Sequence, residues 1–323
     1  MASSLAKIGI VSIGDMGMGI AKLLVANGFS VATNCKGRSN DTIERARSAK
    51  VELFNSDEHL AEACDVILSV VPPRDAAATA QRIVDAVTGP FRRSDPCYFA
   101  DLNAVAPSTT RTIAALFEQT RGQVRFIDGA IIGSPPSPKS DSSGQSSAEW
   151  KVPNIPISGP YKISEIPKYG EKLSTTLNMR HISDEIGAAS GLKMCFASLS
   201  KGFTALAIQS FTTAKSLGVL DELESVMQQH NPDTLKKAAN GVVGMAPKAY
   251  RWVREMEEIA LTFDEEGGFP QDTFQGVAKV YKAVAEDTEL GKEKIGKRKR
   301  GLDINDMAAA MNEGLESKKK KND

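Results

Sequence analysis

The regular alternation of short apolar segments with helix-like segments over the first 130 residues is the feature that most restricts the fold of this chain. Helix-start signals lie between the apolar segments, since Asp41 precedes residues 42–50, Ser56 precedes two acidic residues, and Pro107 opens residues 108–120. Strands that alternate with helices form parallel sheets with crossover helices. We therefore predict an α/β domain with strands at residues 8–13, 30–34, 66–70, 97–101 and 124–127.

The sequence changes character after residue 133. Residues 134–151 are rich in serine, proline and glycine and show no periodicity, so we predict a mobile loop there. Residues 155–159 and 177–182 again resemble strands, which extends the sheet and ends the first domain near Ser183. The predicted domains are therefore residues 1–183 and 184–323.

The second half of the chain has helical spacing throughout. Five apolar residues recur at steps of four and three and form one stripe of a helix over residues 184–217, long enough to join the two domains: Leu192, Phe196, Leu199, Phe203 and Leu206. This stripe is either a dimer interface or intrachain core. Further helices are predicted after Asn231 and over residues 246–263, 271–285 and 304–315, so the second domain is all-α. We predict that the basic tail at residues 317–323 is disordered.

Composition excludes several classes of protein. The 323 residues are 41% hydrophobic, which excludes a disordered chain, and no apolar run is long enough to cross a membrane. Forty basic residues balance forty acidic ones, so we expect no general attraction to nucleic acid. The basic clusters at residues 297–300 and 318–321 are interpreted as solvated surface, with a nuclear address or an anion patch as the alternative.

The cysteines and the N-terminal residues indicate the cellular compartment of the protein. Cys35, Cys64, Cys97 and Cys195 are far apart, without the spacing of a metal site or the density of a disulfide framework. The three histidines also lack metal-ligand spacing, so we predict no metal. The first seven residues do not resemble a secretory signal, and we expect a cytoplasmic protein.

A glycine-rich turn follows the first predicted strand. In dinucleotide-binding folds a turn of the form G-x-G-x-x-G lets the backbone approach a pyrophosphate, whose charge lies at the N-terminus of the next helix. The three glycine positions are occupied here by Ser12, Gly14 and Gly17. We predict a Rossmann-like domain whose cofactor contacts begin with Ser12, Ile13, Gly14, Asp15, Met16 and Gly17. A purely structural turn is the alternative.

The end of the second predicted strand indicates which dinucleotide binds. NAD enzymes commonly carry an acidic residue there, whereas NADP enzymes use cations for the 2′-phosphate. This chain has no acid before Asp41 but has Lys36, Arg38 and Ser39, all of which can donate hydrogen bonds to a phosphate. We predict NADP in preference to NAD. A solvated loop with two basic residues is the alternative.

These motifs together resemble the β-hydroxyacid dehydrogenase superfamily, which contains 6-phosphogluconate and 3-hydroxyisobutyrate dehydrogenases and, as relatives, imine reductases. Residues 14–17 resemble the G-x-M-G of that superfamily, and residues 69–73 lie where it places the strand end beside the cofactor ribose. Residues 101–107 resemble its D-x-S-T-x-x-P segment near the nicotinamide. The resemblance implies that Val71, Pro72 and Asn103 bind cofactor and that Asn103 also contacts substrate. It is strongest to a little-characterised branch.

The resemblance also implies a substrate site. Residues 128–134 are similar to the substrate segment D-A-P-V-S-G-G, with Ile132 in place of the serine, so substrate contacts fall on Ile132, Gly133 and Ser134. Residues 187–196 are similar to the catalytic segment G-x-G-x-x-x-K-x-x-N and keep its lysine as Lys193. Phe196 replaces the substrate-binding asparagine. Lys201 is interpreted either as a surface charge or as a cation for the substrate carboxylate.

The function that the resemblance implies is transfer of hydride between NADP and a small hydroxy or oxo acid, with Lys193 as general acid and base. Family members are commonly dimers through the helical half, so a homodimer is expected. The apolar Ile132 and Phe196 leave an imine reductase open as an alternative. A cofactor-binding protein without turnover is the second alternative, because several site positions diverge from the family pattern.

Overall fold

The computed structural model describes residues 5–89, 93, 95–140, 146–293 and 297–322. The chain divides into two compact units, Met1–Lys193 and Met194–Asp323. This division comes after the predicted domain end at Ser183, because the amides of Gly187, Ala189 and Ser190 bond to Asp128 in the sheet of the first unit. The first residues of the long helix therefore belong to the α/β unit.

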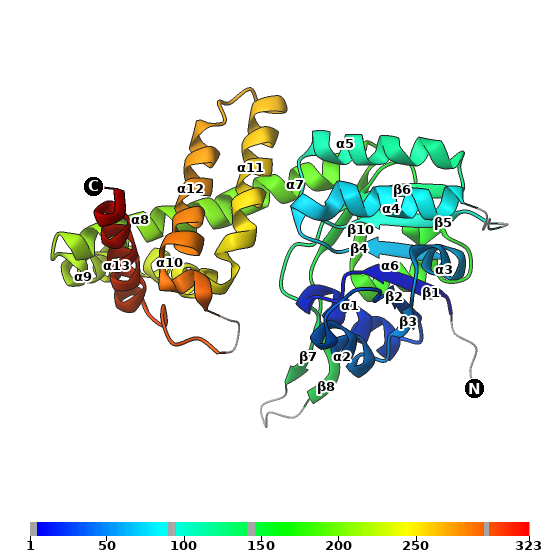
Figure 1. The fold of residues 1–323 in the computed structure, drawn as a ribbon, viewed down its shortest axis with the longest axis horizontal. Helices are drawn as coiled ribbons and strands as arrows, with labels where there is room; N and C mark the ends of the chain where they lie inside the picture. Colours follow the sequence, from blue (N-terminus) through cyan, green and yellow to red (C-terminus); the bar gives the residue numbers. More distant parts are fainter. Residues whose placement is uncertain (1–4, 90–92, 94, 141–145, 294–296, 323) are drawn as a thin grey trace. The chain divides into compact units, whose positions relative to one another are not determined.

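The first unit is built on an eight-stranded sheet in the order β10-β9-β6-β5-β4-β1-β2-β3. Figure 1 shows this sheet with helices packed around it. Its strands are β1 (Lys7–Val11), β2 (Ser30–Asn34), β3 (Glu52–Phe54), β4 (Val66–Ser69), β5 (Cys97–Asp101), β6 (Val124–Gly129), β9 (Ile155–Ser158) and β10 (Met179–Ser183). The first six are mutually parallel, and β9 pairs antiparallel with β6. The predicted α/β sheet is confirmed. The strand β3, only three residues long, was not predicted.

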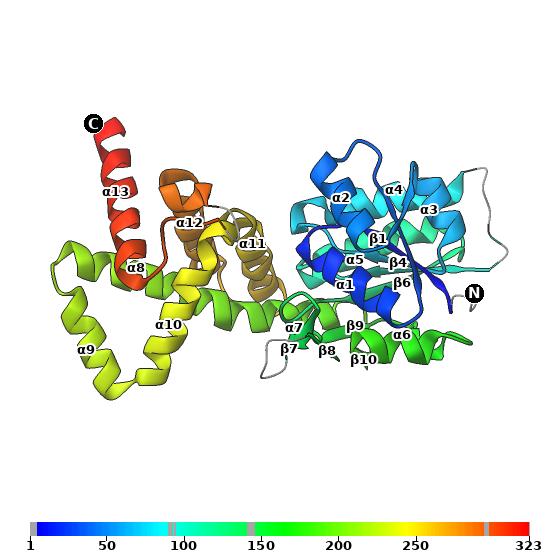
Figure 2. The ribbon, with the colours of Figure 1, turned by 90° about the horizontal axis from the view of Figure 1, so that it is seen from below.

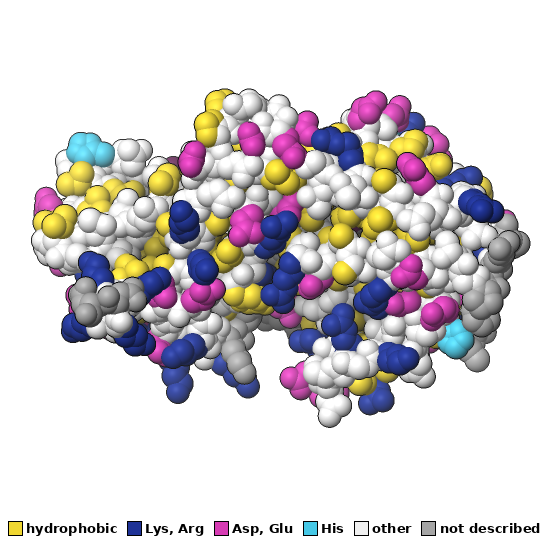
Figure 3. All heavy atoms as spheres, turned by 45° about the horizontal axis from the view of Figure 1, so that its top comes forward, with side chains coloured by type: hydrophobic (Ala, Val, Ile, Leu, Met, Phe, Trp, Pro, Cys, Tyr) yellow, Lys and Arg dark blue, Asp and Glu magenta, His cyan; other side chains and the backbone are white. Residues whose placement is uncertain are grey.

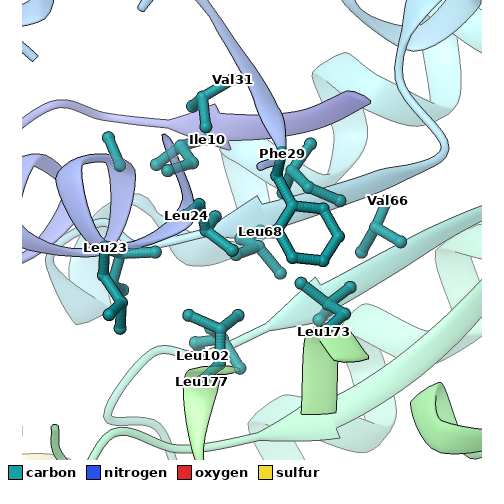
Figure 4. Close-up of a cluster of buried hydrophobic side chains, with 14 of the residues drawn as sticks. Ile10, Leu23, Leu24, Phe29, Val31, Val66, Leu68, Leu102, Leu173 and Leu177 are labelled. Carbon is teal, nitrogen blue, oxygen red and sulfur yellow. The ribbon is translucent and has the colours of Figure 1, made fainter. Parts of the chain in front are cut away.

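Helices cover both faces of this sheet. They are α1 (Asp15–Ala26), α2 (Asn40–Ser48), α3 (Asp57–Ala63), α4 (Ala76–Thr88), α5 (Pro107–Leu116) and α6 (Gly170–Leu177). One core cluster joins the sheet to α1, α2 and α6, and includes Ile10, Leu24 and Leu173 (Figure 4). A second cluster joins the opposite face to α3, α4 and α5. Each large apolar side chain buried in this way stabilises the fold by roughly 1.5–3 kcal/mol.

Residues 134–151, predicted as a mobile loop, contain a two-stranded antiparallel hairpin. Its strands are β7 (Ser137–Ser140) and β8 (Ser146–Lys151), and residues 141–145 lie outside the described residues. Trp150 packs against the core of the first unit, and a Cβ at Gly19 of α1 would lie 2.9 Å from the carbonyl oxygen of Pro136. The loop prediction is wrong for these strands because one tryptophan and one close backbone contact anchor a segment that composition describes as polar.

The second unit is helical. A continuous helical stretch consists of α7 (Ala188–Ala197), a π-helical turn (Ser198–Gly202) and α8 (Phe203–Ser216), and it agrees with the long helix predicted over residues 184–217 apart from its start. The other helices are α9 (Leu220–His230), α10 (Pro232–Met245), α11 (Ala249–Glu265), α12 (Asp272–Asp287) and α13 (Ile304–Asn322). Helices α9 and α10 form a V beside α8 (Figure 2). Short 3₁₀ segments occupy Pro73–Asp75, Phe117–Thr120, Ile163–Glu165, Ala246–Lys248 and Glu289–Lys292.

The apolar stripe of the long helix is mostly exposed. Leu192, Phe196, Leu199 and Leu206 are 42%, 50%, 76% and 60% exposed. The face of α8 that is buried carries Ala205, Ile208 and Phe211 instead. Intrachain core, one of the two predictions for the stripe, is therefore wrong for these four residues.

The basic C-terminal segment is helical, so the predicted disorder of residues 317–323 is wrong over residues 317–322; residue 323 lies outside the described chain. Lys318 bonds to Asp287 at 2.6 Å, and lysines near the C-terminus of a helix interact favourably with its dipole. Basic and acidic side chains are interspersed on the face drawn in Figure 3. Among the described helices, none combines the length and the apolar character needed to span a membrane.

Candidate active site

The predicted cofactor residues follow the carboxyl ends of adjacent parallel strands. Residues 12–17 follow β1, residues 36–39 follow β2, Val71 and Pro72 follow β4, and Asn103 follows β5. The carboxyl ends of parallel strands lie at one edge of a sheet, and ligands bind there next to the point where the strand order reverses. That point lies here between β1 and β4. The fold therefore brings these residues to one edge.

The turn after β1 brings the backbone close to the N-terminus of α1. Ser12 has a φ of 81°, in the left-handed region that glycine adopts most easily. A Cβ at Gly17 would lie 2.2 Å from the carbonyl oxygen of Ser12, so only glycine fits there. Gly14 supplies no side-chain cap to α1, and a Cβ at Gly14 would meet no atom within 4 Å. The open space and the uncapped helix N-terminus fit a pyrophosphate.

The end of β2 opens into a cavity of about 380 Å³. Its lining consists of Asn34, Lys36, Gly37, Arg38, Asp57 and Arg82. The two predicted cations, Lys36 and Arg38, are thus brought together. Ser39 caps α2 by accepting from the amide of Thr42, a role that Asp41 was expected to have, and its hydroxyl proton can still donate to a phosphate.

Two charged residues of this cavity were not predicted as site residues. Asp57 accepts two hydrogen bonds from Arg82, from Nε at 2.8 Å and from Nη2 at 2.9 Å. It also accepts from Nδ2 of Asn34 at 2.8 Å. Asp57 begins α3 and Arg82 lies on α4, so no local sequence motif links either of them to the end of β2.

Asn103 is buried, and its amide is used within the protein. Its Oδ1 accepts from the amide of Val71 at 2.7 Å, and its Nδ2 donates to Ser69 and to Asp101. Asn103 therefore positions the backbone at Val71, next to Pro72. Burial, the largest cause, and the nearby Asp128 raise the pKa of Asp101 to about 7, although its hydrogen bonds from Asn103 act to lower it.

The predicted substrate segment follows β6 and lies within reach of Lys193. Nζ of Lys193 donates to the carbonyl oxygen of Ile131 at 3.0 Å. The backbone of Ile132 exchanges two hydrogen bonds with Asn154, at 2.8 and 3.0 Å, which fixes the segment. Gly133 and Ser134 are exposed beside it. The structure thus brings Lys193 to the segment that carries Ile132, Gly133 and Ser134.

Asp128 at the end of β6 holds the start of α7. Its Oδ2 accepts from Ser158 at 2.7 Å and from the amides of Gly187 and Ala189 at 2.9 and 3.1 Å, while its Oδ1 accepts from Ser190 Oγ at 2.6 Å. A carboxylate at a helix N-terminus is stabilised by the amides and by the helix dipole. Asp128 thereby fixes the helix that carries Lys193. Sequence patterns could not assign it this role, because its backbone donors lie 59 to 62 residues away.

The remaining predicted residues belong to the second unit. Phe196 is half exposed on α7, three residues after Lys193. The ammonium of Lys201 forms an ion pair with Glu255 and lies 4.8 Å from the centre of the Trp252 ring. Its side chain is 16% exposed, so Lys201 is not the surface charge of one prediction. Its contact with a substrate carboxylate stays a prediction.

No cluster of three or more metal-ligating side chains occurs in the part of the chain that the structure describes.

Comparisons with known proteins agree with this architecture. Residues 7–90 match the family described as coenzyme F420-dependent NADP oxidoreductase, and residues 214–284 match a domain of unknown function (DUF1932). A 3-hydroxyisobutyrate dehydrogenase from Salmonella typhimurium superposes with a TM-score of 0.63 at 16% identity, covering 94% of this chain and 99% of the other. The chain has the fold of the 3-hydroxyacid dehydrogenases.

Two further proteins are similar to this chain, one in structure and one in sequence. An imine reductase from Myxococcus stipitatus in complex with NADP⁺ has a TM-score of 0.51 at 17% identity, covering 96% of this chain and 99% of the reductase. An uncharacterised 28.5 kDa protein of Methanothermus fervidus is 24% identical over 261 residues, 79% of this chain and 91% of the relative. The resemblance predicted from the motifs is thus confirmed for the fold.

Proposed function

We propose that this protein is an NADP-dependent oxidoreductase that transfers hydride between the nicotinamide and a small hydroxy or oxo acid. One observation carries the proposal: Nζ of Lys193 lies 3.0 Å from the carbonyl oxygen of Ile131, on the segment that follows β6. The glycine-rich turn and the β2 cavity belong to the same unit and the same sheet. A proton-transfer group and a fitting dinucleotide cradle in one unit support redox chemistry on a hydroxyl or carbonyl carbon.

Different residues of the chain would bind the cofactor, transfer the proton and position the groups that react. Residues 12–17 would hold the pyrophosphate and Val71 the neighbouring ribose; when bound, the nicotinamide supplies or accepts the hydride. Lys193 takes the hydroxyl proton during oxidation and returns it during reduction. In oxidation Lys193 acts as the neutral amine, and the carbonyl of Ile131 accepts a hydrogen bond from its Nζ and orients it. Asp128 keeps the first turn of α7, and with it Lys193, in place.

The preference for NADP over NAD is part of the proposal. Lys36 and Arg38 line the cavity after β2, where they can bind the 2′-phosphate. Replacing Arg38 by Ala removes a charge-assisted contact, which predicts a loss of roughly 10- to 100-fold in NADPH affinity. NADH affinity should change little. Fluorescence titration of both cofactors measures the difference, and an equal loss for both would contradict the assignment.

The reaction is tested with Lys193→Ala. Positioned proton transfer contributes about 100- to 10,000-fold, so turnover should fall by that factor while NADPH affinity is kept. Lys172→Ala, which removes an exposed lysine from α6, is the matched control. Unchanged turnover in Lys193→Ala would remove this lysine from the mechanism.

A substrate panel separates the proposal from its alternatives. NADPH consumption is followed with 2-oxo acids and semialdehydes in one set and with cyclic imines in the other. The apolar side chains of Ile132 and Phe196 favour the imine reductase alternative, and activity on imines alone would establish it. Tight NADPH binding with no turnover in either set would support a cofactor-binding protein.

We also propose a homodimer in the cytoplasm. The exposed stripe of Leu192, Phe196, Leu199 and Leu206 supports a second copy of the chain as its partner, because large exposed apolar surfaces mark interfaces. The four cysteines are free thiols, as a reducing compartment requires. Light scattering should give the mass of a dimer, and Leu199→Glu should lower it. A monomeric wild type at micromolar concentration would refute the dimer.

A further inference from the structure

The cavity at the end of β2 contains a carboxylate where a phosphate is expected to bind. Asp57 lines this cavity, and its side chain is 13% exposed. An acidic residue near this position serves NAD enzymes by binding the ribose hydroxyls, and its charge repels a 2′-phosphate. The predicted preference for NADP therefore requires that the charge of Asp57 be compensated.

Arg82 supplies that compensation. Its guanidinium binds the carboxylate of Asp57 through two nitrogens, Nε at 2.8 Å and Nη2 at 2.9 Å. A two-point contact of this kind fixes the orientation of both groups as well as neutralising them. The side chain of Arg82 is 46% exposed, so it can be replaced without opening a cavity in the core.

Asp57 is also connected to the backbone that carries the cations. Its Oδ1 accepts from Nδ2 of Asn34 at 2.8 Å, and Oδ1 of Asn34 accepts from the amide of Lys36 at 2.9 Å. The amide of Arg38 donates in turn to the carbonyl of Cys35 at 3.1 Å. The ion pair therefore orients Asn34, and Asn34 fixes the start of the segment that presents Lys36 and Arg38.

We propose that the ion pair between Arg82 and Asp57 determines the cofactor specificity of this protein. Arg82 is a positioning residue: it neutralises Asp57, holds it against Asn34, and leaves Lys36 and Arg38 as cations of the cavity that Asp57 does not neutralise. Without Arg82, Asp57 becomes an unpaired anion that opposes the 2′-phosphate and can accept from a ribose hydroxyl. The inference rests on the NADP preference proposed above and names the device that sets it.

The test uses the full-length protein and four variants: Arg82→Ala, Asp57→Asn, their combination, and Lys7→Ala as control. Lys7 forms an ion pair with Glu52 at 2.7 Å and starts β1, so its replacement removes the same charge at the opposite edge of the same sheet. NADPH and NADH are titrated by fluorescence at two salt concentrations. Thermal unfolding shows that each variant is folded.

Arg82→Ala should weaken NADPH binding roughly 10- to 100-fold and change NADH binding by no more than about threefold. Adding Asp57→Asn to Arg82→Ala should recover at least about tenfold of the NADPH affinity, because the unpaired anion is gone. Asp57→Asn alone should keep or raise NADPH affinity. The differences should shrink at high salt, and Lys7→Ala should resemble the wild type.

The outcomes separate this inference from the proposed function. If the wild type binds NADPH and NADH equally, the proposed NADP preference is wrong and the inference fails with it. If the wild type prefers NADPH and Arg82→Ala keeps that preference, only the role of the ion pair is wrong. If Arg82→Ala loses NADPH affinity and the double variant recovers none, Arg82 acts without Asp57, and the proposed device is refuted.

Discussion

The two units bury carboxylates in different surroundings. In the described residues the first unit buries Asp101 and Asp128, and the second buries Glu255 and Glu258. The pair in the first unit accepts from backbone amides, hydroxyls and the amide of Asn103, all of them neutral donors. The pair in the second unit is bound by cations, Glu255 by Lys201 and Glu258 by Arg254 at 2.6 Å.

The buried carboxylates of the first unit lie beside the candidate site, whereas those of the second unit take part in ion pairs between packed helical segments. Asp101 ends β5 and Asp128 is the last residue but one of β6, at the sheet edge that carries the candidate site, and both accept hydrogen bonds from neutral donors there. Glu255 and Glu258 lie on α11, where their charges are cancelled by Lys201 of the π-helical turn and Arg254 of the same helix. A cancelled pair fixes geometry and contributes little field at a distance.

The largest effect is expected for Asp128→Ala. The substitution leaves the amides of Gly187 and Ser190 without this acceptor in a buried region, at a cost of about 1–3 kcal/mol for each unsatisfied group, whereas the amide of Ala189 keeps Ser158 Oγ at 3.0 Å. We expect a total loss of at least about 3 kcal/mol in the free energy of unfolding, measured by urea denaturation. Lys193 should lose its position, so turnover should fall as well.

Asp128→Asn tests whether charge or shape matters. Asparagine keeps one acceptor oxygen and the volume, and charged acceptors contribute about twice as much as neutral ones. We expect a loss of about 1–2 kcal/mol, clearly smaller than that of Asp128→Ala. Equal losses in the two variants would show that the negative charge stabilises α7 more than the hydrogen bonds do.

The next largest loss of unfolding free energy is expected in the helical unit. Glu255→Ala leaves the ammonium of Lys201 without its carboxylate partner, and breaking a buried pair on one side typically costs about 3–5 kcal/mol. We expect a smaller loss of about 2–3 kcal/mol here, because Lys201 keeps the face of Trp252 as a neighbour. Cofactor affinity should not change.

Replacing both partners sharpens the contrast. Lys201→Met together with Glu255→Leu removes both charges and keeps apolar volume, and such replacements of buried pairs are often neutral or stabilising. The double variant should therefore be more stable than Glu255→Ala in the same urea experiment. A double variant that is even less stable would mean that the two charges stabilise this unit more than apolar side chains of similar volume do.

The sequence allowed prediction of the features that depend on neighbouring residues. The strands of the sheet other than β3 follow from local patterns. The turn at residues 12–17 and the cations after β2 do so as well, and the structure brings these two to one edge of the sheet. Lys193 was assigned through the resemblance, and its contact with Ile131 places it by the predicted substrate segment.

The missed features depend on contacts between distant residues. Arg82 and Asp57 are 25 residues apart, and Asp128 lies about 60 residues from the helix that it caps. The strand pair at residues 137–140 and 146–151 depends on Trp150 and the core that it contacts, which composition does not reveal. The burial of Lys201 depends on Glu255 and Trp252, more than 50 residues away in the sequence, so local patterns left its role open.

The smallest expected change in stability concerns Asp101, the second buried carboxylate of the first unit. Asp128 accepts hydrogen bonds on both oxygens, whereas Oδ2 of Asp101 has no hydrogen-bond partner among the described residues. Burial, the largest cause, raises the pKa of Asp101 to about 7, above the value of about 3.9 expected in the unfolded chain. Between about pH 4 and 7 the folded state therefore binds more protons than the unfolded state. The stability that protonated Asp101 contributes is fully present below about pH 4 and is lost as the pH rises to about 7.

Asp101→Asn should remove this pH dependence, because asparagine does not titrate. The difference in unfolding free energy between wild type and Asp101→Asn should decrease by at most about 1.4 kcal/mol per pH unit from pH 4 to 7 and level off above it. Urea denaturation of both proteins from pH 4.5 to 8 measures the difference, which cancels the titration of all other groups. A difference that stays constant with pH would mean that the ionised form of Asp101 is fully stabilised in the folded protein. In that case neutral donors can hold both carboxylates at this sheet edge without a loss of stability near neutral pH.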